Sequence, residues 1–238
     1  MNPPFALWVY LAASPLLWLT LTVGVYVAAD LVAQTCRRHP LVNPVLLSIV
    51  AIAALLLGTG TPYATYFDGA QFVYFLLGPA TVAIAVPLYK NWPTVRRNAL
   101  PMLAALLAGS LVAIVSALGI AAAFGVPRDV LVSLAPKSVT AAVAMSIAEH
   151  LGGVPALTAV LVTLTGVLGS VVVTPLMNAL GIRDYAARGF AVGVAAHGIG
   201  AARAFVVDPL AGTFAGIALG LNAVLSSLLV PVVVRLLL

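Results

Sequence analysis

Long apolar stretches alternate with short polar ones along the whole chain. Each apolar stretch is close to the roughly 20 residues that an α-helix needs to cross the hydrocarbon core of a bilayer. The length of the chain allows about seven to nine such segments. The pattern therefore predicts an all-α, polytopic transmembrane bundle with segments at residues 15–32, 41–58, 71–89, 100–124, 130–150, 154–180, 189–207 and 210–238.

Composition supports the same fold class. The chain is 63% hydrophobic and only 7% charged, whereas a soluble domain carries about 25% charged residues. Such a chain lacks the polar groups to cover its own surface, so we expect lipid to be its solvent and residues 1–238 to form one integral membrane domain. The net charge of +5 does not indicate nucleic-acid binding, because the eleven Lys and Arg residues form no basic stripe.

Several kinds of chemistry have no motif in the sequence. Cys36 is the sole cysteine, so the chain has neither an internal disulfide nor a cysteine-based metal site. No P-loop, H-E-x-x-H or G-x-S-x-G motif is present. We therefore expect no ATP-driven pump, no enzyme, no metal and no cofactor.

The basic loops indicate how the chain is threaded through the membrane. The loops at 37–38 and 90–97 are separated by two segments, so they share a side, which the positive-inside rule makes cytoplasmic. The N-terminus is then outside, and so is the turn-rich loop that we expect at residues 59–69, which holds Asp68. Counting onward places Arg183 and Arg188 outside, against the rule. We expect instead that the segment at 130–150 does not fully cross.

Helix breakers lie inside three apolar segments. Gly78 and Pro79 interrupt the third, Pro136 interrupts the fifth, and small residues surround His197 in the seventh. Interrupted or re-entrant backbone occurs at membrane depth only where protein or a water-filled cavity satisfies it. The pattern of 79–86 resembles that of 136–143, which suggests an internal repeat of the kind found around transporter sites.

Lys137 is the charge that most needs an explanation, because a charge at bilayer depth costs about 2.5 kcal/mol or more. A helix is expected to begin at Pro136, which leaves the first-turn N–H groups without partners. With Lys137, Ser138 and Thr140 these groups would form an anion site. The alternative is that Lys137 reaches an interface and Pro136 simply starts a span.

Another candidate site lies around His197. The residues Gly198 and Gly200 would let a ligand or a helix approach closely. His197 could bind a carboxylate, transfer a proton or hydrogen-bond a neighbouring helix. Arg203 could bind a carboxylate in a bidentate way, or it could extend to the interface and pair with Asp208.

Three further polar residues are assigned roles. Thr81 follows Pro79 as Ser138 follows Pro136, so it is included among the substrate-binding residues. Glu149 lies near an interface and is a candidate for proton coupling together with His197. Asn222 is interpreted as an interhelical hydrogen-bonding residue rather than a ligand.

Three runs resemble the signature regions of the CidB/LrgB family of bacterial membrane proteins. They are FLLGPATVAIAVPLYKNW, LAPKSVTAAVAMSIAEHLGGVPALTAVLVTLTGVLGSVV and ARGFAVGVAAHGIGAARAF. The family is similar in turn to the membrane part of the plastid glycolate/glycerate transporter. The resemblance implies roles for Pro79, Thr81, residues 136–140, 197–200 and Arg203. It also implies a small CidA/LrgA-like partner and a location in the bacterial cell membrane.

Two functions remain open at this point. The chain is expected to be a secondary transporter or facilitator of short monocarboxylates such as pyruvate, glycolate, glycerate or lactate, working by alternating access as a homodimer. Coupling to protons, coupling to Na⁺ and facilitated diffusion are all compatible with the sequence. The alternative is an antiholin-like regulator of murein hydrolase activity and autolysis.

Overall fold

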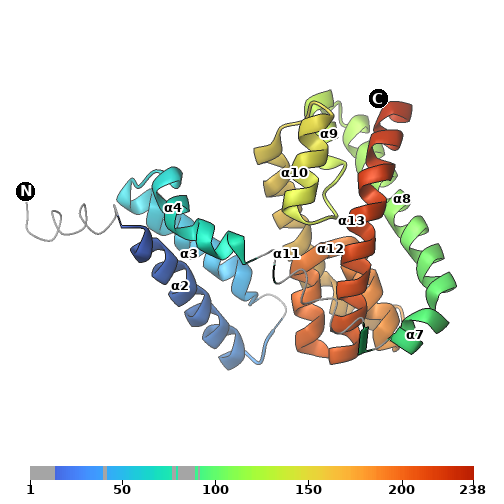
Figure 1. Ribbon diagram of the computed structural model, residues 1–238, viewed down its shortest axis with the longest axis horizontal. Coiled ribbons are helices and arrows are strands. Elements are labelled where there is room, and N and C mark those ends of the chain that lie inside the picture. Colours follow the sequence, from blue (N-terminus) through green and yellow to red (C-terminus); the bar gives the residue numbers. More distant parts are fainter. Residues whose placement is uncertain (1–13, 40–41, 77–78, 80–88, 91) are drawn as a thin grey trace, which may run out of the picture. The chain divides into compact units, whose positions relative to one another are not determined.

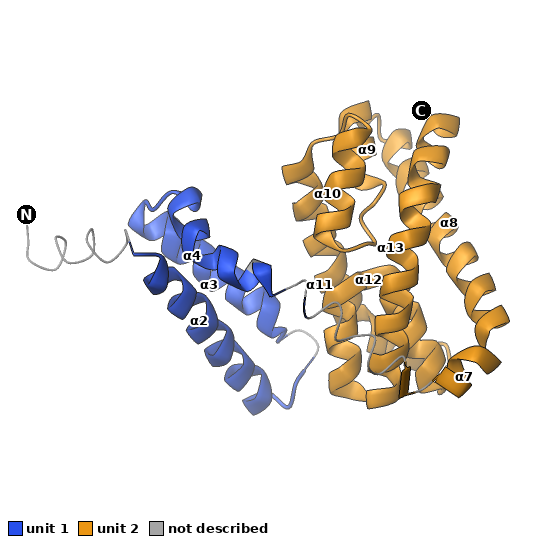
Figure 2. Cartoon of the chain, viewed as in Figure 1, with its two compact units in different colours: residues 1–83 blue, residues 84–238 orange. Residues whose placement is uncertain are grey.

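The fold consists of helices in both of its parts. A computed structural model describes residues 14–39, 42–76, 79, 89–90 and 92–238, which contain no strand, and five of their helices are long and apolar enough to cross a membrane. The predicted all-α, polytopic fold is thus confirmed. The chain separates into two compact units, residues 1–83 and 84–238 (Figure 2). The single domain covering residues 1–238 stays a prediction, and each unit is described by itself.

Unit 1 contains α2 (Pro15–Thr35), α3 (Pro44–Thr59) and α4 (Tyr63–Phe75). Proline at the first helical position starts α2 and α3, where its missing N–H costs nothing. Asn43 caps α3, since its Oδ1 accepts from the N–H groups of Val45 and Leu46 at 2.9 and 3.3 Å.

The prediction of a turn-rich loop at residues 59–69 is wrong from Tyr63 onward, where α4 begins. Packing against α2 outweighs the turn-forming residues in this stretch. Gly69 lies so close to the backbone of Pro15 and to Trp18 that a Cβ atom would collide with them. The rings of Trp18 and Tyr66 meet edge to face at 5.8 Å. Asp68, expected in an external loop, is therefore on a helix.

The described part of unit 2 contains the short helix α7, the long helices α8, α11 and α13, and two interrupted segments (Figure 1). The interrupted segments are α9 with α10, and α12. The helix ends agree with the predicted segments to within a few residues, because prolines start α11 and α13 and Asp208 caps α13 through Oδ1. The helices are α7 (Trp92–Arg97), α8 (Ala99–Ala123), α9 (Arg128–Leu134), α10 (Ala141–His150), α11 (Pro155–Ala179), α12 (Tyr185–Val207) and α13 (Pro209–Leu237).

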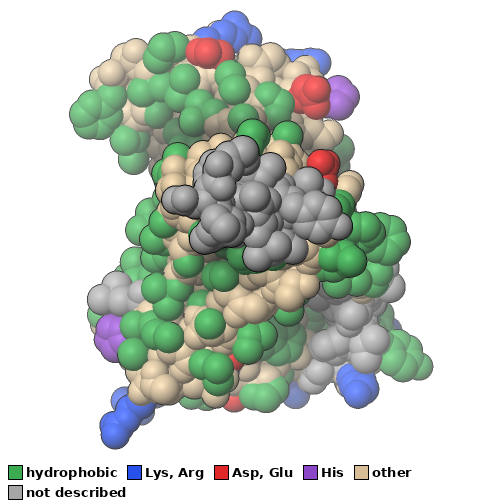
Figure 3. Space-filling view, turned by 90° about the vertical axis from the view of Figure 1, so that its left-hand side faces the viewer, with side chains coloured by type: hydrophobic (Ala, Val, Ile, Leu, Met, Phe, Trp, Pro, Cys, Tyr) green, Lys and Arg blue, Asp and Glu red, His purple; other side chains and the backbone are tan. Residues whose placement is uncertain are grey.

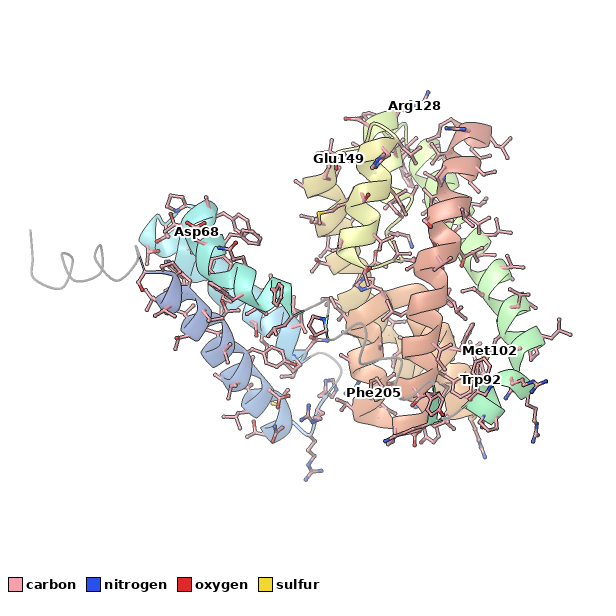
Figure 4. The ribbon with its side chains drawn as sticks, in the orientation of Figure 1. Asp68, Trp92, Met102, Arg128, Glu149 and Phe205 are labelled. Carbon is pink, nitrogen blue, oxygen red and sulfur yellow. The ribbon has the colours of Figure 1, made fainter. Side chains whose placement is uncertain are left out.

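The helices α9 and α10 form a re-entrant hairpin. Both pack on the C-terminal parts of α8 and α13, in a cluster that includes Leu118, Val132, Ile147 and Val230. Arg128, at the start of α9, donates to the carbonyl oxygen of Leu238. Arg128 and Glu149 lie at the same end of unit 2 (Figure 4). The segment at 130–150 thus returns to the end from which it started, as predicted.

The helix α12 forms a second hairpin, although by length and composition it could cross a membrane. Its first arm packs on the beginning of α13, with Gly189 against the backbone of Ala211. Its second arm packs on the same stretch, with Phe205 against Gly212. Phe205 lies at the end of unit 2 opposite to Arg128 (Figure 4). The two hairpins therefore enter from opposite ends.

Among the helices that the structure describes in unit 2, α8, α11 and α13 run between its two ends (Figure 1). Each hairpin returns to the end of unit 2 from which it starts. The loops before α8 and before α12 therefore lie at one end, where Arg97 and Asp184 line the same cavity. Arg183 and Arg188 thus lie at the same end as Arg96 and Arg97, which removes the conflict with the positive-inside rule.

Much of the surface is apolar. Hydrophobic side chains are spread over the face shown in Figure 3, among backbone and other side chains, and few charged side chains appear on it. Large side chains such as Leu111, Val112, Leu168 and Leu228 are exposed on long helices. A surface of this kind is suited to contact with lipid tails.

Candidate functional site

The first helix break lies at the tip of the α9–α10 hairpin, in residues 135–140. The expectation that a helix begins at Pro136 is wrong, because α10 begins only at Ala141. The Lys137 N–H is used by a tight turn, in which it donates to the Leu134 carbonyl at 3.1 Å. Thr140 then adopts an extended backbone, with ψ at 146°, before α10 starts.

The polar side chains of this tip are partly accessible. Lys137, Ser138 and Thr140 are half-buried, whereas Pro136 is fully buried. The Lys137 Nζ atom lies 3.4 Å from Ser138 Oγ, at the long limit for a hydrogen bond. The tip thus presents an ammonium group and two hydroxyl groups beside a buried proline.

The second break lies at the tip of α12. Ala196 and His197 leave the helical conformation, and His197 has a φ of 41°. A positive φ is strained in a residue with a Cβ, at a cost of about 1–3 kcal/mol, and such residues cluster at functional sites. Gly200 allows the reversal, because it lies against Val192 of the first arm, where a Cβ atom would collide.

His197 is buried and bonded to a neighbouring helix. It is 4% exposed, and its Nε2 atom lies 2.9 Å from the carbonyl oxygen of Val162 in α11. A carbonyl can only accept, so Nε2 carries the hydrogen and Nδ1 is left as the nitrogen available to a ligand or a proton. The structure thus contains the helix-bonding arrangement that the sequence left open for this residue.

Gly166 of α11 makes room for the His197 ring. A Cβ atom on Gly166 would lie 2.6 Å from His197 Cε1 and 2.8 Å from Nε2. We expect Gly166→Ala to displace the ring and to lower the free energy of unfolding by about 1–3 kcal/mol. Thermal unfolding of the purified protein measures this loss. The matched control is Gly119→Ala, since no atom lies within 4 Å of the added Cβ there; equal losses would contradict this role for Gly166.

Asn222 in the middle of α13 connects the two breaks. Its Nδ2 atom donates to the carbonyl oxygen of Ser138 at 3.2 Å and to that of Val194 at 3.0 Å. Its Oδ1 atom accepts from the hydroxyl groups of Ser110 on α8, at 2.7 Å, and Ser226 one turn along α13, at 3.2 Å. One buried amide therefore bonds to both hairpin tips and to α8.

Both tips also contact Val162 of α11. Val139 of the first tip packs in one buried cluster with Ala144 and Val162. The carbonyl group of Val162 bonds to His197 of the second tip. The two interrupted segments, which are about 60 residues apart in the sequence, are thus connected through Asn222 of α13 and Val162 of α11.

The other predicted site residues are more scattered. Glu149 is exposed at the end of α10, and Gly198 and Arg203 are half-buried on the second arm of α12. Gly78 and Thr81 lie outside the described residues, as does most of the proposed repeat, while Pro79 is exposed.

Sequence reasoning underestimated Asn222. It recognised a hydrogen-bonding residue but not the two carbonyl groups that accept its N–H bonds, since they lie 84 and 28 residues away. The available signal was a lone amide in the middle of an apolar stretch.

A cavity of about 830 Å³ lies beside this junction, between α7, α8, the first arm of α12 and the start of α13. Its lining is mostly apolar, with Arg97, Asn98 and Asp184 among the polar residues. None of the described residues predicted for the site lines it. It does reach Val194 and Ala195, directly before the second break.

Comparison with known proteins finds one matching family and several relatives. A model of the LrgB-like family matches residues 22–236. The uncharacterized protein YxaC of Bacillus subtilis is 38% identical over 216 residues, covering 90% of this chain and 93% of that protein. The holin-like protein CidB of Staphylococcus aureus is 34% identical over 221 residues, covering 93% and 96%. No solved structure matches.

Proposed function

The chain belongs to the LrgB-like family of membrane proteins, and on this premise we propose that it is a secondary transporter or facilitator of short monocarboxylates. Pyruvate, glycolate, glycerate and lactate are the substrates to test first. The substrate site lies at the two hairpin tips, where Lys137, Ser138 and Thr140 bind the carboxylate and His197 contributes Nδ1.

The observation that carries this proposal is the bonding of both tips to one buried amide. Two hairpins that enter from opposite ends and meet at mid-depth form a barrier that can open toward either end. Broken helices at such a position are typical of transporter sites. The positive charge of Lys137 at the barrier favours an anion, because an ammonium group and hydroxyl donors offset the loss of its hydration.

Orientation follows from the distribution of basic residues. Lys90, Arg96, Arg97, Arg183 and Arg188 gather at one end of unit 2, and we assign this end to the cytoplasm. The N-terminus is then outside the cell. The protein itself lies in the cell membrane of a bacterium. A homodimer and proton coupling through His197 or Glu149 remain part of the proposal.

A second function is favoured by the names of relatives. CidB of two staphylococcal species is described as holin-like, which agrees with an antiholin-like regulator that acts with a small CidA/LrgA-like membrane partner. Such a role requires apolar contact surfaces, but it gives no reason for a lysine at a hairpin tip.

Uptake into liposomes tests the transport proposal directly. Purified protein, reconstituted alone and together with a small partner chain, should take up labelled pyruvate, glycolate or lactate in a saturable way. Empty liposomes and liposomes containing heat-unfolded protein are the controls. Folded protein that takes up none of the short monocarboxylates, with or without the partner, would contradict transport and leave the regulatory role.

A further inference from the structure

Asn222 has a geometry that goes beyond ordinary packing between helices. It is 1% exposed, in the middle of α13. A side-chain amide has two N–H hydrogens, and each of them here has a different destination: the first hairpin through Ser138 and the second through Val194. The two hairpins belong to opposite ends of unit 2, so one nitrogen atom joins elements that enter from the two sides.

The orientation of this amide is fixed by its other half. The hydroxyl groups of Ser110 and Ser226, which are 2% and 4% exposed, donate to Oδ1. If the amide were turned over, its oxygen would face the carbonyl oxygens of Ser138 and Val194, and like dipoles would repel. Two anchored hydroxyl groups therefore hold the N–H groups toward the tips.

We propose that Asn222 is a positioning residue that holds the two hairpin tips together, and that opening of the barrier toward either end breaks one of its two N–H bonds. Opening one tip leaves the other tip bonded, whereas opening both tips at once loses both bonds. The amide thus favours states in which only one side is open, which is what a transporter requires and a pore does not. This inference rests on the proposed function, but its structural part is testable without a substrate.

Cross-linking between the tips tests the structural part. In a Cys36→Ser background, which has no other cysteine, Ser138→Cys and Ala195→Cys place one thiol on each tip and keep both backbone carbonyls. A short bifunctional thiol reagent applied to membranes should join the two positions rapidly. We expect Asn222→Asp to slow this cross-linking about tenfold, because the carboxylate still accepts from both serines but has no N–H to donate.

The matched control is Ser227→Ala, which removes an exposed hydroxyl group that bonds to the Val224 carbonyl oxygen and leaves the bonds of Asn222 in place. Its cross-linking rate should stay within about twofold of the parent. Should Asn222→Asp fail to fold, Asn222→Ser replaces it: a hydroxyl group has a single hydrogen, and the same slowing is expected. A rate that does not change in a folded Asn222 variant would overturn the proposal.

Transport supplies a second readout that a merely structural role would not move. In liposomes, the Asn222→Asp variant should add a non-saturable leak of the carboxylate to its uptake, whereas Ser227→Ala should keep saturable uptake alone. A folded variant with unchanged KM and no leak would overturn the proposal even if cross-linking changed. Absence of uptake by the parent protein would instead contradict the proposed function, and the cross-linking result would still decide the role of Asn222.

Discussion

Replacing Lys137 by alanine should reduce saturable uptake of a short monocarboxylate about 10- to 150-fold. A hydrogen bond to a charged group contributes about 1.5–3 kcal/mol, and in the proposed site this ammonium group is the only full positive charge at the tips of the two hairpins. Lys137 is half-buried, and its Nζ atom lies near Ser138 Oγ, so the charge can face a ligand without leaving the tip. The initial rate of labelled pyruvate uptake, measured over a range of concentrations, gives the loss in kcat/KM.

The chain offers its own control for this change. It contains only two lysines, Lys90 and Lys137, and Lys90 is exposed before α7. The variant Lys90→Ala removes the same charge and should keep uptake within about twofold. Lys137→Arg should recover part of the activity, since the positive charge remains. If Lys137→Ala and Lys90→Ala behaved alike, Lys137 would not bind the substrate.

Replacing Gly193 by alanine should prevent the close contact between α12 and α13 and destabilise the protein by about 3 kcal/mol. A Cβ atom there would collide with the Ala215 carbonyl oxygen and lie 2.8 Å from Ala215 Cα and from Ala218 Cβ. Backbone atoms cannot move aside as the end of a flexible side chain can, so overpacking at this position is costly. The unfolding midpoint in detergent and the yield of folded protein measure the effect.

Gly198 provides the comparison on the same helix. No atom lies within 4 Å of the Cβ that Gly198→Ala would add, and alanine is the better helix former by about 1 kcal/mol. Gly198→Ala should therefore be as stable as the parent or slightly more stable. Equal unfolding midpoints for Gly193→Ala and Gly198→Ala would show that the contact between α12 and α13 is looser than described.

The sequence indicated where the helices break, but not how the tips are built. Pro136 and the glycines around His197 were sufficient to predict the positions of the breaks, because a proline lacks an N–H and glycines permit unusual backbone conformations. The conflict in the positive-inside count then identified the segment at 130–150 as re-entrant. These signals depend on the local sequence and not on contacts between distant segments.

The remaining features depend on contacts that a sequence does not display. The helix expected to start at Pro136 begins at Ala141 instead. The carbonyl groups of Leu134 and Pro136 accept turn hydrogen bonds from the N–H groups of Lys137 and Val139. The helix α4 forms where turn residues predicted a loop, because Gly69 packs on α2. The partners of Asn222 are set by the meeting of three distant segments, and no periodicity reveals such a meeting.

The order of synthesis gives the bond between Ser138 and Asn222 a further consequence. The two helices of the first hairpin have 7 and 10 residues, and neither is long enough to be retained in a bilayer as a span by itself. Their tip receives its amide donor only from α13, 84 residues later in the chain. A ribosome therefore releases the hairpin well before its partner exists, so a nascent chain that ends before α13 leaves that tip carbonyl without its donor. Membrane quality-control proteases would meet an incompletely bonded hairpin in every truncated chain.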